Sequence, residues 1–234
     1  MASKSPSAYD DLRYDDKTDT GFLILPSRRR LRDYKNYIRP QRGFNPDIVQ
    51  ELKVMVRNYT DQERYITLVV DEMKVQEDLV WDKHTGDLIG YVDLGYKEVN
   101  WATLKDSQQI APHILVFLVR SVVNPLKFSF ANFATKDVSA INLFPIFWKA
   151  VGILEDCELK VIAVTSDGAS SNRTFYKMHK NMPGSVVAGE ECVTYKTPNI
   201  FAEDDRHIHF ICDQPHVLKT GRNNLILHSI NRLG

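Results

Sequence analysis

Apolar positions along the chain form two kinds of pattern, short continuous runs and helical repeats. The short runs are rich in β-branched residues and predict strands at 65–70, 79–82, 88–94, 114–123, 126–130, 159–164 and 209–212. Helical repeats predict helices that begin near Asn45, Asp137, Ser171 and Asp213, while residues 183–206 have neither pattern and are expected to form a loop. Extended segments come first, and helices and strands then alternate. This order predicts an α/β fold with a mixed sheet, antiparallel at first and parallel later, flanked by helices.

Local signals support several of these elements. Asn45 followed by Pro46 is a strong helix start, because the side chain of Asn45 can cap the helix and proline has a pre-set φ. The glycine-bearing turn at 83–87 predicts a hairpin between its two flanking strands. Pro145 removes the hydrogen bond to the carbonyl of Ile141, so we expect it to kink its helix or to begin the second half.

Composition places the chain among globular proteins and excludes several classes. Its 234 residues are 43% apolar and 26% charged, enough for one large domain or two small ones. Three widely spaced cysteines argue against a disulfide framework and against a thiolate zinc site. Apolar runs are far shorter than the roughly 20 residues of a membrane span, and the polar start has no signal-peptide core. Neither secretion nor membrane insertion is expected.

Charge is balanced overall but not locally. Lysine plus arginine and aspartate plus glutamate both total 30, so nucleic-acid binding would need a local basic patch. Residues 1–20 hold five aspartates and predict an unpacked acidic tail. Between 28 and 42 seven basic residues face Asp33 alone, a net charge of 7 − 1 = +6. That segment is a solvated basic face, a phosphate contact or a nuclear-import signal.

Three aspartates each follow a predicted buried strand, namely Asp71, Asp167 and Asp213. If these strands are neighbours and parallel, the three carboxylates converge at one edge of the sheet. Such a group repels itself unless a cation neutralises it, and hard oxygen ligands suit Mg²⁺ or Mn²⁺. A single aspartate at a strand end is more often a turn former or a helix cap, so the structural reading stays open for each of them.

Several motifs occur together in a specific order. They are Leu25-Pro-Ser27, Pro40-Gln-Arg-Gly-Phe44, Asp71-Glu72-Met73, Ser166-Asp-Gly-Ala-Ser170 and Cys212-Asp213-Gln-Pro-His216. No single block is decisive, but the combination closely resembles the nuclease domain of P-element-type transposases, the THAP-domain transposase family, over about residues 22–234.

This resemblance implies a ribonuclease-H-like fold that cuts and joins DNA with two divalent metal ions, Mg²⁺ or Mn²⁺. It implies that Asp71 and Asp167 are catalytic and bind metal, and that Asp213 and His216 form an accessory motif. It also implies transposon-end DNA as a partner, a second transposase chain as a further one, and a nuclear location. The basic residues that we select as candidates for DNA contact are Arg28, Arg29, Arg30, Arg32, Lys219 and Arg222.

The sequence also departs from the family pattern. The family's catalytic glutamate follows a GTP-binding insertion domain, and neither is found in these 234 residues, nor is a C₂CH zinc-binding THAP module. We therefore expect an acidic tail at 1–21, a basic segment and helix at 22–62, and a ribonuclease-H-like domain at 63–234 that is incomplete at its carboxyl end. Because only two of the family's three catalytic acids are found, the chain alone is expected not to cleave or join DNA. Without the insertion domain, GTP is not expected to bind.

Two other classes stay open. A metal-dependent hydrolase would use His207, His209, Asp213 and His216, since His207 and His209 share one face if their segment is a strand and histidine suits zinc. A non-catalytic scaffold would keep the fold for binding DNA or protein. A metal-binding measurement on the isolated chain would distinguish a non-catalytic scaffold from an active nuclease.

Overall fold

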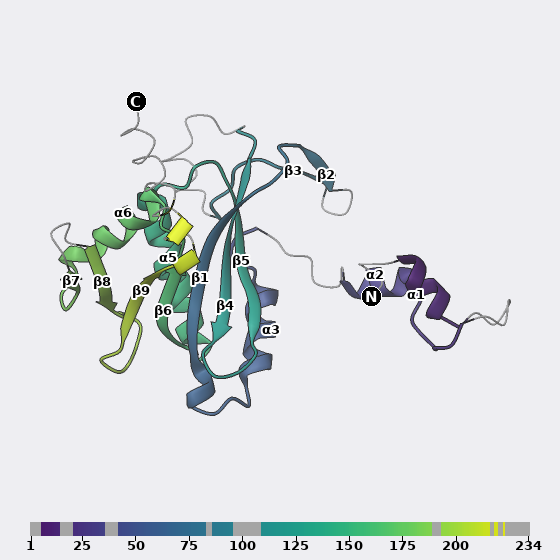
Figure 1. Ribbon diagram of the computed structural model, residues 1–234, viewed down its shortest axis with the longest axis horizontal. Helices are drawn as coiled ribbons and strands as arrows, with labels where there is room; N and C mark the ends of the chain where they lie inside the picture. Colours follow the sequence, from purple (N-terminus) through teal and green to yellow (C-terminus); the bar gives the residue numbers. More distant parts are fainter. Residues whose placement is uncertain are drawn as a thin grey trace. The chain divides into compact units, whose positions relative to one another are not determined.

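A computed structural model describes residues 6–14, 21–35, 42–82, 86–95, 109–188, 193–215, 218–219 and 222 (Figure 1). The chain forms two compact units, Met1–Pro40 and Gln41–Gly234, and each is described by itself. The boundaries that the sequence suggests after residues 21 and 62 stay predictions.

The first unit contains two short helices, α1 (Pro6–Leu12) and α2 (Arg28–Lys35). The sequence predicts an unpacked tail where α1 lies, because its aspartates dominate the composition. Two interactions order this segment in the structure. Tyr9 is buried and donates a hydrogen bond to a backbone carbonyl ahead of α2, 2.7 Å away, and Asp10 forms an ion pair with Arg28.

The second unit carries the sheet. Its elements are α3 (Pro46–Val56), η1 (Gln62–Arg64), β1 (Tyr65–Lys74), β2 (Val80–Asp82), β3 (Asp87–Ile89), β4 (His113–Ser121), β5 (Lys127–Thr135), α5 (Ala140–Asp156), β6 (Lys160–Ser166), α6 (Ser170–Met178), η2 (His179–Asn181), β7 (Val186–Ala188), β8 (Val193–Pro198) and β9 (His207–Cys212). Every predicted strand has a counterpart here, including the hairpin, which is β2–β3, and so do the helices predicted near Asn45, Asp137 and Ser171. The helix predicted near Asp213 falls mostly outside the described residues, of which 214–215, 218–219 and 222 are helical.

The main sheet has seven strands in the order β5-β4-β1-β6-β9-β8-β7. Strand β1 is antiparallel to β4 and parallel to β6, and β6 is parallel to β9. This confirms the predicted mixed α/β sheet. Figure 1 shows the same order, with α5 and α6 beside the parallel half.

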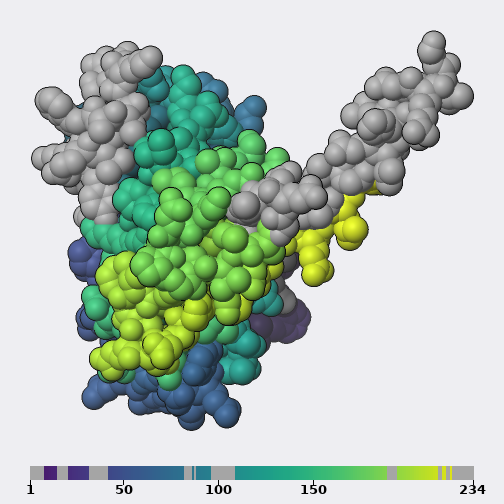
Figure 2. Space-filling model, turned by 90° about the vertical axis from the view of Figure 1, so that its left-hand side faces the viewer, coloured from purple at the N-terminus to yellow at the C-terminus, as the bar shows by residue number. Residues whose placement is uncertain are grey.

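Strands β7 and β8 correct the prediction of a loop over 183–206. Both are antiparallel additions at the far edge of the sheet, and this edge faces the viewer in Figure 2. The sequence missed them because β7 is short and because β8 buries polar residues, Thr194 and Thr197, instead of apolar ones. Without an apolar run, a strand has no hydrophobic pattern to reveal it.

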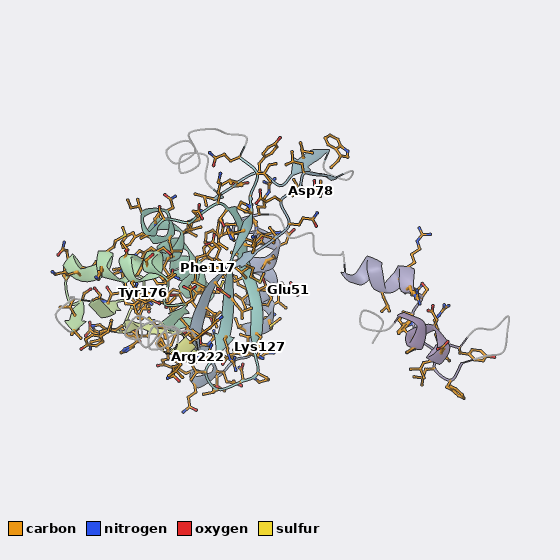
Figure 3. The ribbon with its side chains drawn as sticks, turned by 45° about the horizontal axis from the view of Figure 1, so that its top comes forward. Glu51, Asp78, Phe117, Lys127, Tyr176 and Arg222 are labelled. Carbon is orange, nitrogen blue, oxygen red and sulfur yellow. The ribbon has the colours of Figure 1, made fainter. Side chains whose placement is uncertain are left out.

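Alternation of side chains on β1 explains where the core lies. Ile66, Leu68 and Val70 are buried on one face, as expected for a strand with period two. Phe117 of β4 lies opposite Val70 and is fully buried; Figure 3 labels it in the middle of the sheet. Helix α3 buries its own apolar stripe, and the Asn45 side chain caps it as predicted, accepting from the backbone N–H of the second helical residue at 2.9 Å.

Helix α5 runs through Pro145 as one element. It begins at Ala140, and Ser139 caps it by accepting a hydrogen bond from the backbone N–H of Asn142 at 3.3 Å. Pro145 therefore lies inside the helix and does not begin a second half, although its ring still removes the hydrogen bond to Ile141. Most of the inward face of this helix is fully buried.

A buried histidine lies where α5, α6 and β9 meet. His179 is fully buried, and its Nδ1 donates to the carbonyl oxygen of Phe175 at 2.9 Å. The rings of Phe144, Phe175 and Phe210 have centroids 4.8–4.9 Å from that of the imidazole. Burial among these rings penalises the charged form and lowers the pKa of His179 to about 4.

This burial predicts how stability depends on pH. Because the pKa of His179 is lowered in the folded state, only the unfolded chain takes up its proton between its ordinary value of about 6.5 and about 4. We expect the free energy of unfolding to fall by about 2 kcal/mol from pH 8 to pH 5 on account of this group. A His179→Phe variant should lose that part of the pH dependence in urea unfolding. His209→Gln, at an exposed position, is the control and should keep it; equal slopes for all three proteins would contradict the buried neutral imidazole.

Candidate active site

The parallel pairing of β1 with β6 brings two predicted site residues to one pocket. The register of these strands ends at Val69 opposite Thr165, so Asp71 and Asp167 each lie two residues further along neighbouring strands. Both side chains line a pocket of about 50 Å³. The sequence predicted this placement.

Asp71 lies at the point where the buried part of β1 ends. Every second residue before it is buried, whereas the strand is exposed from Asp71 to Lys74. The strand itself continues to Lys74 because it stays paired with β4. Asp71 Oδ1 accepts a hydrogen bond from the backbone N–H of Glu72 at 2.9 Å, which fixes one carboxylate oxygen.

Asp167 is held by the start of α6. Its Oδ1 accepts hydrogen bonds from the backbone N–H of Ala169 at 3.1 Å and from Nδ2 of Asn172 at 2.6 Å. Both donors belong to the turn that leads into the helix or to its first residues. The Asp167 side chain therefore takes the part of a helix cap, and its contacts with α6 hold it in one orientation.

A buried hydrogen bond joins α6 to the end of β6, next to Asp167. The hydroxyls of Ser166 and Tyr176 are 2.6 Å apart, and the hydroxyl of Tyr176 also lies 3.3 Å from the carbonyl oxygen of Ile211, to which it can donate. Burial is the main cause that raises the pKa of Tyr176 to about 12. One side chain of α6, labelled in Figure 3, thus connects the ends of β6 and β9.

Asp213 lies level with Asp167 but outside the pocket. Its backbone N–H donates to the carbonyl oxygen of Ser166 at 2.8 Å, and the β6–β9 register ends just before it, at Cys212. The residues that line the pocket do not include it. The accessory partner predicted for it, His216, lies outside the described residues.

The basic candidates fall in two places. Arg28, Arg29 and Arg30 are exposed on α2 of the first unit, where Arg32 is also helical. Lys219 and Arg222 are exposed helical residues after β9 in the second unit. The structure therefore does not gather all of them on one element.

Among the polar residues that line the pocket, Glu72, Ser171 and Asn172 were not selected from the sequence. Glu72 lines the pocket, and its Oε1 accepts a hydrogen bond from the hydroxyl of Thr135 at 2.6 Å. Strand alternation suggests that Glu72 should point away from Asp71, so the pattern gave no reason to select it. Asn172, which also lines the pocket, sits in the first turn of a predicted helix, and capping rules applied to that turn would have drawn attention to it.

The donor set suits a hard divalent cation. In the described part of the chain, neither Asp71 nor Asp167 has a lysine or arginine within ion-pair distance, although both are carboxylates at one pocket. Carboxylate oxygens are the ligands that Mg²⁺ and Mn²⁺ prefer. Among the described residues, no group of three or more histidine, cysteine or acidic side chains could hold a metal.

Strand geometry contradicts the histidine hydrolase. His207 begins β9 and Asp213 follows its end, and six residues of extended chain span about 20 Å. These two residues cannot share one metal ion. His209 lies four residues before Asp213 and is about 13 Å away by the same measure.

The sheet order, with one acid where the buried part of β1 ends and one just after the parallel strand next to it, is that of a ribonuclease-H-like α/β domain. A family model described as "TNP-like, RNase H N-terminal domain" matches residues 40–180. Because this is more than half of the chain, the chain belongs to that family. No helix in the described residues is long and apolar enough to cross a bilayer.

Two proteins that the chain resembles are described as transposases. The human protein "DNA transposase THAP9" is 24% identical over 205 residues, which is 86% of this chain and 21% of that protein. A chain of the "Drosophila P element transposase strand transfer complex" aligns with a TM-score of 0.63 and 20% identity, covering 95% of this chain and 41% of that one. The chain thus spans about a fifth of the human relative and two fifths of the Drosophila chain. These findings confirm the predicted family resemblance and fold.

The Ser166–Tyr176 hydrogen bond predicts a cost for its removal. Tyr176→Phe leaves the buried hydroxyl of Ser166 without that partner, and we expect it to lower the free energy of unfolding by about 1–3 kcal/mol in urea titration. Tyr195→Phe, at an exposed tyrosine, is the matched control and should change it by less than about 0.5 kcal/mol. Similar values for the two variants would show that the hydrogen bond does not contribute.

Proposed function

We propose that this chain supplies the metal-binding aspartates of a DNA transposase catalytic domain, which breaks and joins phosphodiester bonds. The observation that carries the proposal is the placement of Asp71 and Asp167 at one pocket, each two residues past the last paired position of neighbouring parallel strands. The similarity to a human DNA transposase and to a P element strand transfer complex supports this reading.

Asp71 and Asp167 would hold the divalent ions, Mg²⁺ or Mn²⁺, through carboxylate oxygens. Bound there, the ions would activate water or a 3′-hydroxyl as the nucleophile and stabilise the leaving oxygen. The protein's own part is orientation. Asn172 and the backbone N–H of Ala169 both bind Oδ1 of Asp167, which directs the remaining carboxylate oxygen to a ligand. Fixed carboxylates bind metal better than mobile ones because less conformational entropy is lost on binding.

We propose accessory roles for Asp213 and His216 beside this pair. Asp213 is level with Asp167 on the next strand, where it can orient a water molecule or approach the substrate backbone. We further propose that the six basic candidates, Arg28, Arg29, Arg30, Arg32, Lys219 and Arg222, contact DNA phosphates. The DNA would be transposon ends, and the site of action would be the nucleus.

Two aspartates offer few oxygen ligands for two hard ions, each of which takes six or more. We therefore expect residues 1–234 alone to bind one divalent ion weakly. A non-catalytic scaffold is the second candidate, favoured by the absence, among the described residues, of three metal-ligating side chains in one group. A metal titration distinguishes the two.

The metal role predicts a specific loss of Mn²⁺ binding. Residues 1–234 should bind Mn²⁺ in a titration followed by the electron paramagnetic resonance signal of the free ion. Asp71→Asn and Asp167→Asn should each weaken binding by about tenfold or more, about 1.4 kcal/mol. Asp156→Asn, an exposed aspartate at the end of α5, should leave it unchanged. Equal binding by all four proteins would assign the chain to the scaffold class.

The shortage of ligands predicts that the chain alone is inactive. In a nicking assay with Mg²⁺ or Mn²⁺, we expect no more cleavage of DNA by residues 1–234 than by the Asp71→Ala, Asp167→Ala double variant. Robust cleavage that is lost in the double variant would overturn this expectation. It would show that the two aspartates suffice or that Asp213 serves as the third acid.

A further inference from the structure

One face of the main sheet is not covered by α3, α5 or α6. The buried cluster that these helices share with β1 contains Ile66 and Leu68. Thr67 and Val69 alternate with them along β1, so they point to the opposite face, where both are half-buried and outside that cluster. Asp71 continues the same alternation. This open face, as we call it, therefore carries the first candidate metal ligand at its upper end.

A row of basic residues crosses the open face at right angles to the strands. Thr67 pairs with Arg120 of β4 on one side and with Ala163 of β6 on the other. Side chains of directly paired residues share one face. Following the register outwards defines the basic row, which consists of Lys127 of β5 (labelled in Figure 3), Arg120 of β4, His209 of β9 and Lys196 of β8. Only Thr67 and Ala163, both small, separate its two halves.

The cations of the basic row are not neutralised. Arg120 and Lys127 are exposed and lie directly opposite each other, and like charges in such a pair destabilise it. Within the described chain, no ion pair includes Arg120, Lys127 or Lys196. Asp71 is the only acid among the described strand residues of the open face. The row therefore favours a polyanion, which would relieve the repulsion between its cations.

The dimensions of the open face suit duplex DNA. Neighbouring strands are about 4.8 Å apart, so the backbones of Arg120 and His209, three strands apart, are separated by about 14 Å. The major groove of DNA is about 12 Å wide, and the phosphates of the two strands line its edges. Thr67 precedes Asp71 by four residues, about 13 Å along β1. One duplex can therefore rest on the row and also reach the candidate metal site.

We propose that the open face binds duplex DNA, with the phosphates of its two strands on the two halves of the basic row. Arg120 and Lys127 hold one strand. Lys196 and His209 hold the other, and the His209 ring donates an N–H to a phosphate oxygen. Along β1 the duplex extends to Asp71. The proposal rests on the proposed function for what happens at that end of the duplex, but the contact with the row needs no metal ion.

Fluorescence anisotropy of a labelled DNA duplex, titrated with the full chain in EDTA, tests this surface. Arg120→Gln with Lys127→Gln should weaken binding by about tenfold or more, because two phosphate contacts and their released counterions are lost. The slope of log K against log salt should become shallower by about 2 × 0.9 = 1.8. A merely structural role for the two residues would not change this slope.

Lys53→Gln with Arg57→Gln is the matched control. It also removes one exposed lysine and one exposed arginine, from α3 and its C-cap, and α3 packs on the covered face of the sheet. Because salt screens charges that lie farther than about 10 Å from the DNA, the control should change neither the affinity nor the slope appreciably. Circular dichroism of each variant confirms that it is folded before binding is measured.

Asp71→Asn tests whether the duplex reaches the candidate metal site. Without metal, the Asp71 carboxylate repels a nearby phosphate, so this variant should bind the duplex about twofold or more tightly in EDTA. The same variant should lose Mn²⁺ binding if the proposed function is correct. Unchanged Mn²⁺ binding with a weakened basic-row variant would contradict the metal site alone and would support the row.

Four results would overturn the proposal. The first is unchanged affinity and salt slope in the basic-row variant. The second is equal weakening by the α3 control, which would show an effect of net charge. The third is unchanged binding by Asp71→Asn in EDTA, which would place the duplex away from the aspartates. The fourth is a basic-row variant that loses affinity for single-stranded DNA but not for the duplex.

Discussion

The parallel pairing of β1 with β6 is the constraint on which the site depends. It sets Asp71 and Asp167 at the same level, two residues past the last paired positions. Two carboxylates at one pocket with no described basic partner repel each other, and this repulsion favours a cation between them. The fold can hold such a pair because the strands below it are buried and cannot slide. A shift of one residue would move every buried side chain of β1 to the other face.

Helix α6 connects the site to the buried core and holds Asp167 in place. Its first turn binds Asp167 through Asn172, and its last turn connects two strand ends through Tyr176. His179, just after the helix, is enclosed by aromatic rings. Each contact uses a different kind of interaction, but all fix one helix against β6 and β9. The depressed pKa of His179 and the raised pKa of Tyr176 have the same main origin, which is burial.

Much of this arrangement could be predicted because it follows from periodicity and caps. The β-branched runs gave the strands, Asn45 and Pro46 gave the start of α3, and the order of strands and helices gave the placement of Asp71 and Asp167. A polar strand such as β8 has no apolar run from which it could be predicted. Helix α1 could not be predicted from composition either, because the contact of Tyr9 that orders it is long-range. Capping rules would have drawn attention to Asn172, but its role depends on where Asp167 points, which the sequence does not show. The role proposed for His216 stays a prediction.

The two groups of acids in the second unit differ in rigidity, and this difference decides what each can bind. Asp71 and Asp167 sit on the ends of strands in a seven-stranded sheet, and hydrogen bonds orient both carboxylates. A hard divalent ion needs ligands held in a defined geometry, which such positions supply. The acids of the β2–β3 hairpin lie on a separate two-stranded ribbon, and a ribbon of two strands is only marginally stable by itself. Such a ribbon cannot hold metal ligands in a defined geometry as the ends of the seven-stranded sheet can. The same residue type therefore suits a metal site at one place and not at the other, because the backbone beneath it differs.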